Sequence, residues 1–205
     1  MKYILVILFV LCSVQSKIVM IGDSILDSSV TTIHEKLEIL AKQSIENYSK
    51  SGATITPNLN DKPCIPCQFN ASTNISVAEI IIMDGGANDI LTISKNPSWL
   101  KFPLYRQRII SIESNLNLLF SEMKDLGVGQ VIYLGNYYLD GNQAIVDYGT
   151  NILMNICRQA PLHVHFVDVR QFTIPLKEND IHPNTVGDEI LAQNIWNVLK
   201  NITIN

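Results

Sequence analysis

The sequence predicts an α/β fold in which a parallel sheet is covered by helices on both faces. Short apolar runs alternate with longer amphipathic stretches along the chain, and this alternation is typical of successive βαβ units. The apolar runs are nearly continuous, as expected of strands that are buried on both faces. In such a sheet the carboxyl ends of the strands share one edge, and ligands bind there.

Five apolar segments are predicted as strands. They are residues 17–21, 44–48, 79–83, 130–134 and 163–169. The stretches between them have the apolar periodicity of helices. The predicted helices are residues 28–42, 104–126, 142–159 and 184–200. Residues 53–73 are predicted to be a loop, because prolines interrupt a polar stretch there.

Length and composition favour one domain. The chain has 205 residues, of which 47% are hydrophobic and 17% are charged, and this is enough for one sizeable core. No internal repeat or linker indicates a second domain. The net charge is -4 and no basic cluster is present, which argues against a nucleic-acid partner because phosphate binding needs concentrated Lys and Arg.

Residues 1–16 are predicted to be a secretory signal peptide. A single lysine precedes an apolar run that ends at Cys12, and residues 13–16 are suited to a cleavage site. The run is shorter than the roughly 20 residues of a membrane span; an uncleaved anchor is the alternative. We therefore expect a mature domain of residues 17–205 that is secreted, or periplasmic in a bacterium, with no stable membrane span after cleavage.

Three cysteines remain in the mature chain: Cys64, Cys67 and Cys157. An odd number leaves one thiol free or intermolecular. Cys64 and Cys67 have the spacing of a redox dithiol, but they lie in the predicted loop and not at the start of a helix. A structural disulfide is therefore expected, either within this pair or from Cys157 to one of its members. A secreted thiol oxidoreductase is one alternative function, and no zinc site is expected because no histidine stands at finger spacing.

A serine and a histidine stand where two predicted strands end. Ser24 follows the first strand, and His182 lies in the loop after the last one. A hydroxyl nucleophile and an imidazole base, whose pKa lies near working pH, are what acyl transfer from an ester needs. Asp180 and Asn179 lie close to His182 in the sequence and could orient its ring.

Three residues at strand ends could stabilise an oxyanion. Ser24 and Gly52 could each donate a backbone N–H, and Asn88 could donate its side-chain amide. Other polar residues near these positions are expected to have structural roles. Asp23 is expected to hold a turn, and Asp89 to fix the loop that carries Asn88.

Four sequence blocks resemble the SGNH hydrolases, also called GDSL esterases and lipases. They are "IGDS" at 21–24, Gly52 within "SKSGAT", "GAND" at 86–89 and "DIHPN" at 180–184, in the family's order. The resemblance spans essentially the whole mature chain. It implies a flavodoxin-like three-layer α/β/α sandwich with a central five-stranded parallel sheet. It also implies hydrolysis of an ester through a serine acyl-enzyme, without a metal or another cofactor.

The resemblance assigns roles to the same residues. Ser24 would be the nucleophile and His182 the base, and the oxyanion hole would consist of the Ser24 and Gly52 N–H groups and the Asn88 amide. The expected substrate is a small-molecule, lipid or carbohydrate ester. The short chain favours small or exposed acyl groups over long-chain triglycerides.

One position departs from the family pattern. The family places the triad aspartate three residues before the histidine, where this chain has Asn179. We expect the loop to shift by one residue so that Asp180 reaches the ring of His182. Alternatively, Asn179 holds the ring and a slower Ser–His dyad acts. The alternative function is a catalytically impaired SGNH-fold binding or surface protein.

Overall fold

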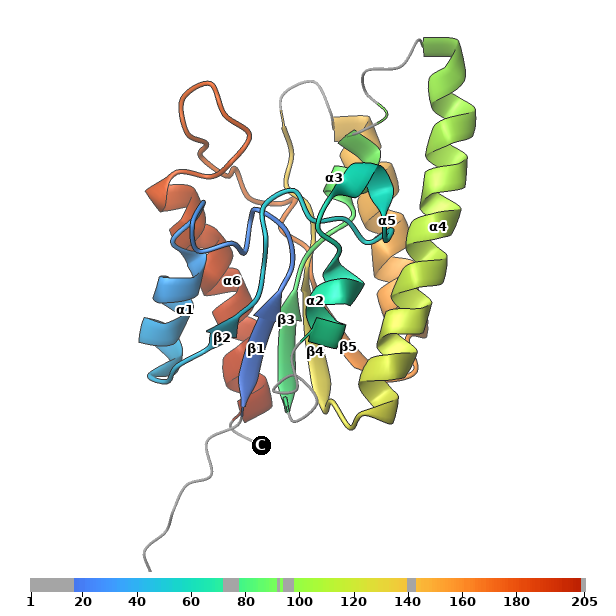
Figure 1. The fold of residues 1–205 in the computed structure, drawn as a ribbon. Helices are drawn as coiled ribbons and strands as arrows, with labels where there is room; N and C mark the ends of the chain where they lie inside the picture. The colour runs from blue at the N-terminus through green and yellow to red at the C-terminus, as the bar shows by residue number, and fades with distance from the viewer. Residues whose placement is uncertain (1–16, 72–77, 92, 94–97, 140–142, 204–205) are drawn as a thin grey trace, which may run out of the picture.

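A five-stranded parallel sheet forms the centre of the described structure (Figure 1). The computed structural model describes residues 17–71, 78–91, 93, 98–139 and 143–203, so the predicted leader lies outside it. The strands are β1 (Ile18–Ile21), β2 (Glu46–Asn47), β3 (Ile80–Met83), β4 (Gln130–Leu134) and β5 (His163–Val167). Their order is β2-β1-β3-β4-β5, and each neighbouring pair is parallel. The predicted fold class is confirmed.

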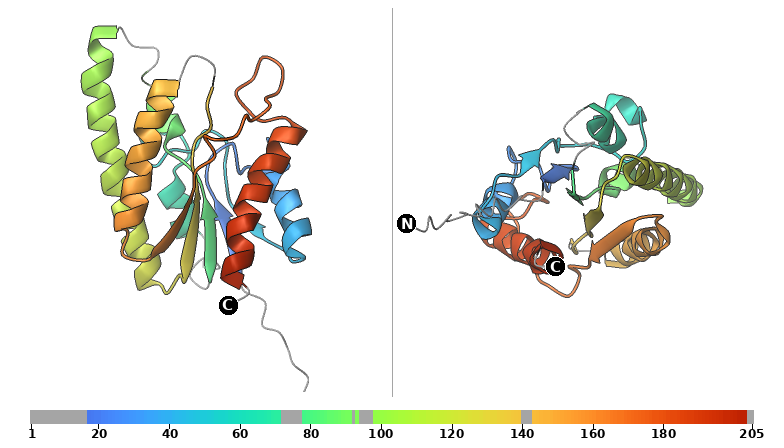
Figure 2. Two further views of the ribbon diagram at one scale, coloured as in Figure 1. Left: turned by 180° about the vertical axis from the view of Figure 1, so that it is seen from behind. Right: turned by 90° about the horizontal axis from the view of Figure 1, so that it is seen from below.

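Helices cover both faces of the sheet, which gives three layers (Figure 2). On one face lie α1 (Ile33–Ala41) and α6 (Thr185–Thr203). On the other lie α2 (Ile65–Ala71), α4 (Ser98–Asp125) and α5 (Gln143–Gln159). The short helix α3 (Ala87–Leu91) and the 3₁₀ helix η1 (Leu59–Asp61) lie in the connections.

The two inner strands supply both apolar cores. All four residues of β1 and all four of β3 are buried. Because successive side chains of a strand point to opposite faces, Ile81 belongs to the core under α4 and α5, whereas Ile82 belongs to the core under α1 and α6. Continuous apolar runs are therefore required here, and this is why the sequence showed these strands so clearly.

The predicted loop at residues 53–73 is wrong over Ile65–Ala71, which forms α2. Pro66 is the second residue of this helix. Proline is tolerated in a first helical turn because its missing N–H would have no partner there. The short helix α3 was also not predicted. Pro66 therefore marks a helix start and not a loop, although a proline in a polar stretch is typical of a loop.

Two helix starts differ from their predictions. The helix predicted from residue 28 begins at Ile33, because residues 28–31 form a turn in which Val30 and Thr31 donate their N–H groups to the Asp27 carbonyl at 2.9 and 3.1 Å. The helix predicted from residue 104 begins at Ser98 and contains Pro103. None of the helices among the described residues is long and apolar enough to cross a membrane.

Candidate active site

Ser24 lies in a buried turn directly after β1. The loop that follows β1 lies at the upper edge of the sheet in Figure 1. Only 8% of its surface is exposed. The turn begins with Gly22, where a Cβ atom would lie 1.8 Å from Oδ1 of Asp84. Only glycine therefore allows the Asp84 carboxyl to reach the Asp23 N–H, which it accepts at 2.7 Å. We call residues 22–26 the nucleophile turn.

Two buried carboxyl groups lie beside Ser24. Asp23 is 3% exposed and Asp84 is 4% exposed. Burial raises the pKa of both groups, and the negative charge of Asp23 raises the pKa of Asp84 further, well above its ordinary value. Asp84 is therefore the protonated member and donates a hydrogen bond to the Asp23 carboxylate. Asp23 also accepts the Ile25 N–H at 3.1 Å, which is the structural role expected of it.

The side chain of Asn88 joins the blocks that carry Ser24 and Gly52. Its Nδ2 atom donates to Oδ2 of Asp23 at 3.2 Å and to the carbonyl oxygen of Ala53 at 3.1 Å. Asp23 precedes Ser24, and Ala53 follows Gly52. Gly52 itself has φ +77°, a left-handed conformation that favours glycine. The three residues predicted to stabilise an oxyanion are thus brought together, and an oxyanion would have to replace one of the two acceptors of the Asn88 amide.

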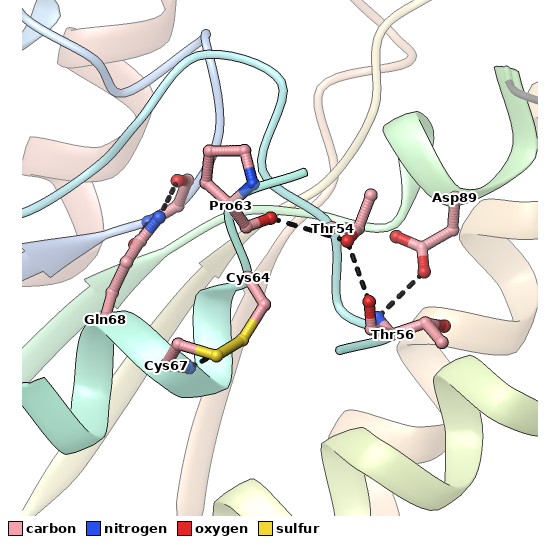
Figure 3. The surroundings of a disulfide bond; sticks show 8 residues. Thr54, Thr56, Pro63, Cys64, Cys67, Gln68 and Asp89 are labelled. Carbon is pink, nitrogen blue, oxygen red and sulfur yellow. Dashed lines mark hydrogen bonds between the residues drawn. A yellow bond between two sulfur atoms is a disulfide. The ribbon is translucent and has the colours of Figure 1, made fainter. Parts of the chain in front are cut away.

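Asp89 fixes the segment that follows Gly52. Its carboxylate accepts the N–H groups of Ile55 and Thr56, both at 2.9 Å. Figure 3 shows the contact with Thr56. Its side chain is fully buried, and burial raises its pKa although the hydrogen bonds from Thr56 and Ile55 act in the opposite direction. Asp89 therefore ties the segment after Gly52 to α3, which carries Asn88, whereas the sequence predicted only that it fixes the loop of Asn88.

His182 meets Asp180 and not Asn179. Nδ1 of the His182 ring lies 2.7 Å from Oδ1 of Asp180. This hydrogen bond is the main reason why the pKa of Asp180 is lowered. Asn179 has φ +56°, a left-handed conformation, and the following residue is thereby turned onto the ring. The geometry agrees with the expected one-residue shift, and the catalytic role of Asp180 stays a prediction.

Hydrogen bonds of Tyr137, Lys177 and Asn184 hold the loop that carries His182. The hydroxyl of Tyr137 donates to the carbonyl of Ile181 at 2.7 Å, and the carbonyl of His182 accepts the Lys177 N–H at 2.9 Å. Asn184 then begins α6, because its Oδ1 atom accepts the N–H groups of the first helical turn at 3.0 and 3.1 Å. Tyr137 follows β4, so a second strand end supports this loop, and no sequence motif indicated that contact.

His182 also acts on the nucleophile turn. Burial is the largest influence on the pKa of Asp23 and raises it, whereas the charge of His182 lowers it. Asp23 is the residue before Ser24, so the charge of His182 acts on the turn that carries the predicted nucleophile. The loops after β1 and β5 lie at the same edge of the sheet (Figure 1).

Cys64 and Cys67 form a disulfide (Figure 3), and Cys157 is free and buried. The alternative pairing through Cys157 is therefore wrong. The disulfide spans the first turn of α2, so the expectation that the pair lies in a loop is also wrong. Cys64 is only 4% exposed. A buried first cysteine is poorly placed to attack a substrate, because reactive cysteines are partly exposed.

No described cluster of three or more His, Cys, Asp or Glu side chains is arranged to hold a metal ion. His163 and His165 stack on each other along β5, with ring centroids 4.5 Å apart. Nε2 of His165 lies 2.6 Å from Oε1 of Gln130 on the neighbouring strand. These contacts give both histidines a structural role on the edge strand β5.

The model of the GDSL-like Lipase/Acylhydrolase family matches residues 18–195. This chain belongs to that family. The GDSL hydrolase is accordingly a carboxylic ester hydrolase. The matched residues include all four blocks, from the nucleophile turn to the His182 loop. No curated protein sequence matches the chain.

Solved structures share the fold of this GDSL hydrolase at low sequence identity. An α/β hydrolase, LAE5, from the metagenome of Lake Arreo has a TM-score of 0.63 and 19% identity, over 90% of this chain and 95% of its own. The acetyl xylan esterase AlAXEase has a TM-score of 0.68 and 12% sequence identity, and the match covers 89% of this chain and 99% of its own. The psychrotrophic esterase EstA from Pseudoalteromonas sp. has a TM-score of 0.62 and 14% sequence identity, and the match covers 93% of this chain and 100% of its own. The full length of these three chains is therefore nearly matched.

Proposed function

We propose that this GDSL hydrolase is a secreted serine esterase, periplasmic if its source is a bacterium, in which Ser24, His182 and Asp180 act as a triad. The 2.7 Å hydrogen bond between His182 and Asp180 carries the proposal. In this proposal Asp180 takes the role of the triad aspartate, which the family pattern places one residue earlier, at the position of Asn179. The predicted leader supports secretion.

The proposed reaction has two halves. The Asp180 carboxylate accepts a hydrogen bond from the Nδ1–H group of His182, so Nε2 is free to take the proton of the Ser24 hydroxyl. The Ser24 oxygen bonds to the ester carbonyl carbon, and His182 then gives the proton to the departing alcohol. Water attacks the acyl-enzyme with help from the same base and releases the acid.

The oxyanion of each half-reaction would be held by donors from three loops. The backbone N–H groups of Ser24 and Gly52 and the amide of Asn88 are the proposed donors. Asp23 and the carbonyl of Ala53 already hold the Asn88 amide in this region. Donors that are fixed before the reaction stabilise developing charge without reorganisation, and losing one typically costs about 10²- to 10³-fold in turnover.

Covalent labelling tests the nucleophile. The full chain would be expressed in a secreting host, and the protein from the medium exposed to a fluorophosphonate probe. We expect an adduct on the peptide that contains Ser24, none in Ser24→Ala, and an unchanged adduct in Ser28→Ala, which replaces an exposed serine four residues away. The N-terminus of the secreted protein should be Lys17. An adduct on another residue would contradict the proposed triad.

The same preparation tests the size of the acyl group. We expect kcat/KM to be higher for p-nitrophenyl acetate than for the laurate ester, because the chain is short and its sequence indicates no large lid-like insertion beyond residues 53–76. The likeness to an acetyl xylan esterase points the same way. A clear preference for the longer chain would contradict the expectation.

The second candidate function is a binding protein that has lost catalysis. Asn179 at the family's aspartate position is the observation that favours it. Folded protein that neither reacts with the probe nor turns over p-nitrophenyl acetate would support this candidate against the esterase.

A further inference from the structure

Gln68 holds the residue at which β1 passes into the nucleophile turn. Its side chain is only 6% exposed. Its Oε1 atom accepts the Gly22 N–H at 2.8 Å, and its Nε2 atom donates to the Gly22 carbonyl at 2.8 Å. Both polar ends of one amide therefore bind one residue, two positions before Ser24. The pairing of β1 with β3 ends at Ile21. Beyond that point the Gly22 carbonyl also accepts the Lys50 N–H at 3.0 Å, and the Gly22 N–H is held by Gln68.

The residues just before Gln68 bind the loop that carries Gly52. The Thr54 N–H donates to the carbonyl of Pro63 at 2.9 Å, and the Ile65 N–H donates to the carbonyl of Thr54 at 2.9 Å. Figure 3 shows Thr54 beside Pro63. This is a single parallel bridge between Thr54 and Cys64. Thr54 lies two residues after Gly52, so the same short segment that reaches the nucleophile turn also fixes the second block.

Ile65 makes the third connection. It is fully buried, and a Cβ atom on Gly85 would lie 2.5 Å from its Cδ1 atom. Gly85 begins the loop that leads to Asn88. Residues 63–68, which we call the disulfide turn, thus contact all three strand-end loops that carry the proposed nucleophile and oxyanion donors.

The Cys64–Cys67 disulfide links the part of the disulfide turn that binds Thr54 to the part that carries Gln68. It joins the bridge residue to the residue that precedes Gln68. The helix that carries Gln68 has seven residues, and so short a helix is marginal without outside support. The covalent link keeps its first turn closed, and the Gln68 amide is thereby held against Gly22.

We propose that Gln68 is a positioning residue for Ser24 and that the Cys64–Cys67 disulfide holds it in place. This inference rests on the proposed function, because it assumes that Ser24 is the nucleophile. Without the amide, the Gly22 N–H loses its buried acceptor and the turn can move. A displacement of about 1 Å at a reacting group can cost on the order of 10²-fold in rate. We therefore expect kcat to fall by roughly 10- to 100-fold in Gln68→Ala, with KM little changed.

Gln68→Glu separates positioning from mere structural support. The introduced carboxylate keeps the acceptor for the Gly22 N–H but repels the Gly22 carbonyl. Protonation restores the donor, and burial near the carboxyl groups of Asp23 and Asp84 favours protonation. The kcat of this variant, as a ratio to wild type at each pH, should therefore rise as the pH is lowered. Gln193→Ala, which replaces an exposed glutamine of α6, is the control and should leave the ratio flat.

The disulfide is tested without touching Gln68. In one arm Cys64→Ala/Cys67→Ala replaces both cysteines. In the other, dithiothreitol cleaves the S–S bond of the wild type to two thiols and is itself oxidised to its cyclic disulfide. Both arms should lower kcat and the rate of fluorophosphonate labelling, by less than Gln68→Ala does. If Gln68→Ala does not fold, this arm and Gln68→Glu decide the question.

The outcomes separate this inference from the proposed function. Wild type that does not react with the probe overturns the proposed function and this inference with it. Wild type that is labelled at Ser24, with unchanged kcat in Gln68→Ala, overturns the inference alone. A ratio of Gln68→Glu kcat to wild-type kcat that does not change with pH also overturns the inference. A purely structural contact would lower thermal stability, but protonation of the introduced carboxylate would not restore kcat.

Discussion

Replacing Asp180 by alanine should lower kcat for p-nitrophenyl acetate by roughly 10²- to 10⁴-fold, the range that spans loss of ring orientation in serine hydrolases. The reason is the 2.7 Å contact between Oδ1 of Asp180 and Nδ1 of His182. Without it the imidazole is free to turn and to place its proton on the wrong nitrogen. Steady-state kinetics and the rate of probe labelling should fall together, and KM should change little.

Asn179→Gly is the matched control for Asp180. It removes the side chain that occupies the family's aspartate position, and glycine accepts the left-handed φ of +56° without strain. We expect kcat within about twofold of wild type, since a substitution that leaves the His182 contact intact should cost little. The reverse result, a large loss in Asn179→Gly and a small one in Asp180→Ala, would assign ring orientation to Asn179.

The strands could be predicted because burial on both faces leaves little room for polar residues. β1 and β3 read as apolar runs for this reason, and their positions were correct within one or two residues. The helix at Ile65–Ala71 could not be predicted in the same way. It is short, it contains Pro66 in its first turn, and a disulfide and a bridge to Thr54 hold it in place. Tertiary contacts, and not helix propensity, decide its structure.

The candidate site was predictable where a motif carries it. Ser24, Gly52, Asn88 and His182 lie in blocks that the sequence shows, and the structure joins them through the contacts of Asn88 and Asp180. The partners of these residues carry no motif. Gln68 reaches Gly22 across 46 positions, and a single sequence does not reveal such a contact.

Asp84 provides the second large effect, on stability. Its Oδ1 atom accepts the Asp23 N–H at 2.7 Å in a fully enclosed site, and its protonated carboxyl donates to the Asp23 carboxylate. Asp84→Ala removes both interactions. We expect the free energy of unfolding to fall by about 2–4 kcal/mol, the sum of two buried hydrogen bonds to charged or backbone groups. Asp84→Asn keeps one acceptor oxygen and one N–H donor, so it should retain wild-type stability at pH 5 when unfolding is measured in urea.

The pH dependence should distinguish the proton of Asp84 from its shape. Its pKa in the folded protein is raised by burial and by the charge of Asp23, so the folded state holds a proton that the unfolded state has lost. The stability that this proton contributes is complete below the ordinary aspartate pKa and is lost as the pH rises through the raised value. The difference in unfolding free energy between Asp84→Asn and wild type should therefore grow with pH from 5 to 8, by at most about 1.4 kcal/mol per pH unit. Asp27→Asn is the control. The pKa of Asp27 is lowered by its hydrogen bonds, against the effect of burial, so its contribution is lost only as the pH falls below the ordinary aspartate pKa, and the difference from wild type should stay constant from pH 5 to 8. A difference for Asp84→Asn that stays constant with pH would show that Asp23 and Asp84 do not share a proton, and that the buried pair beside Ser24 is held by geometry alone.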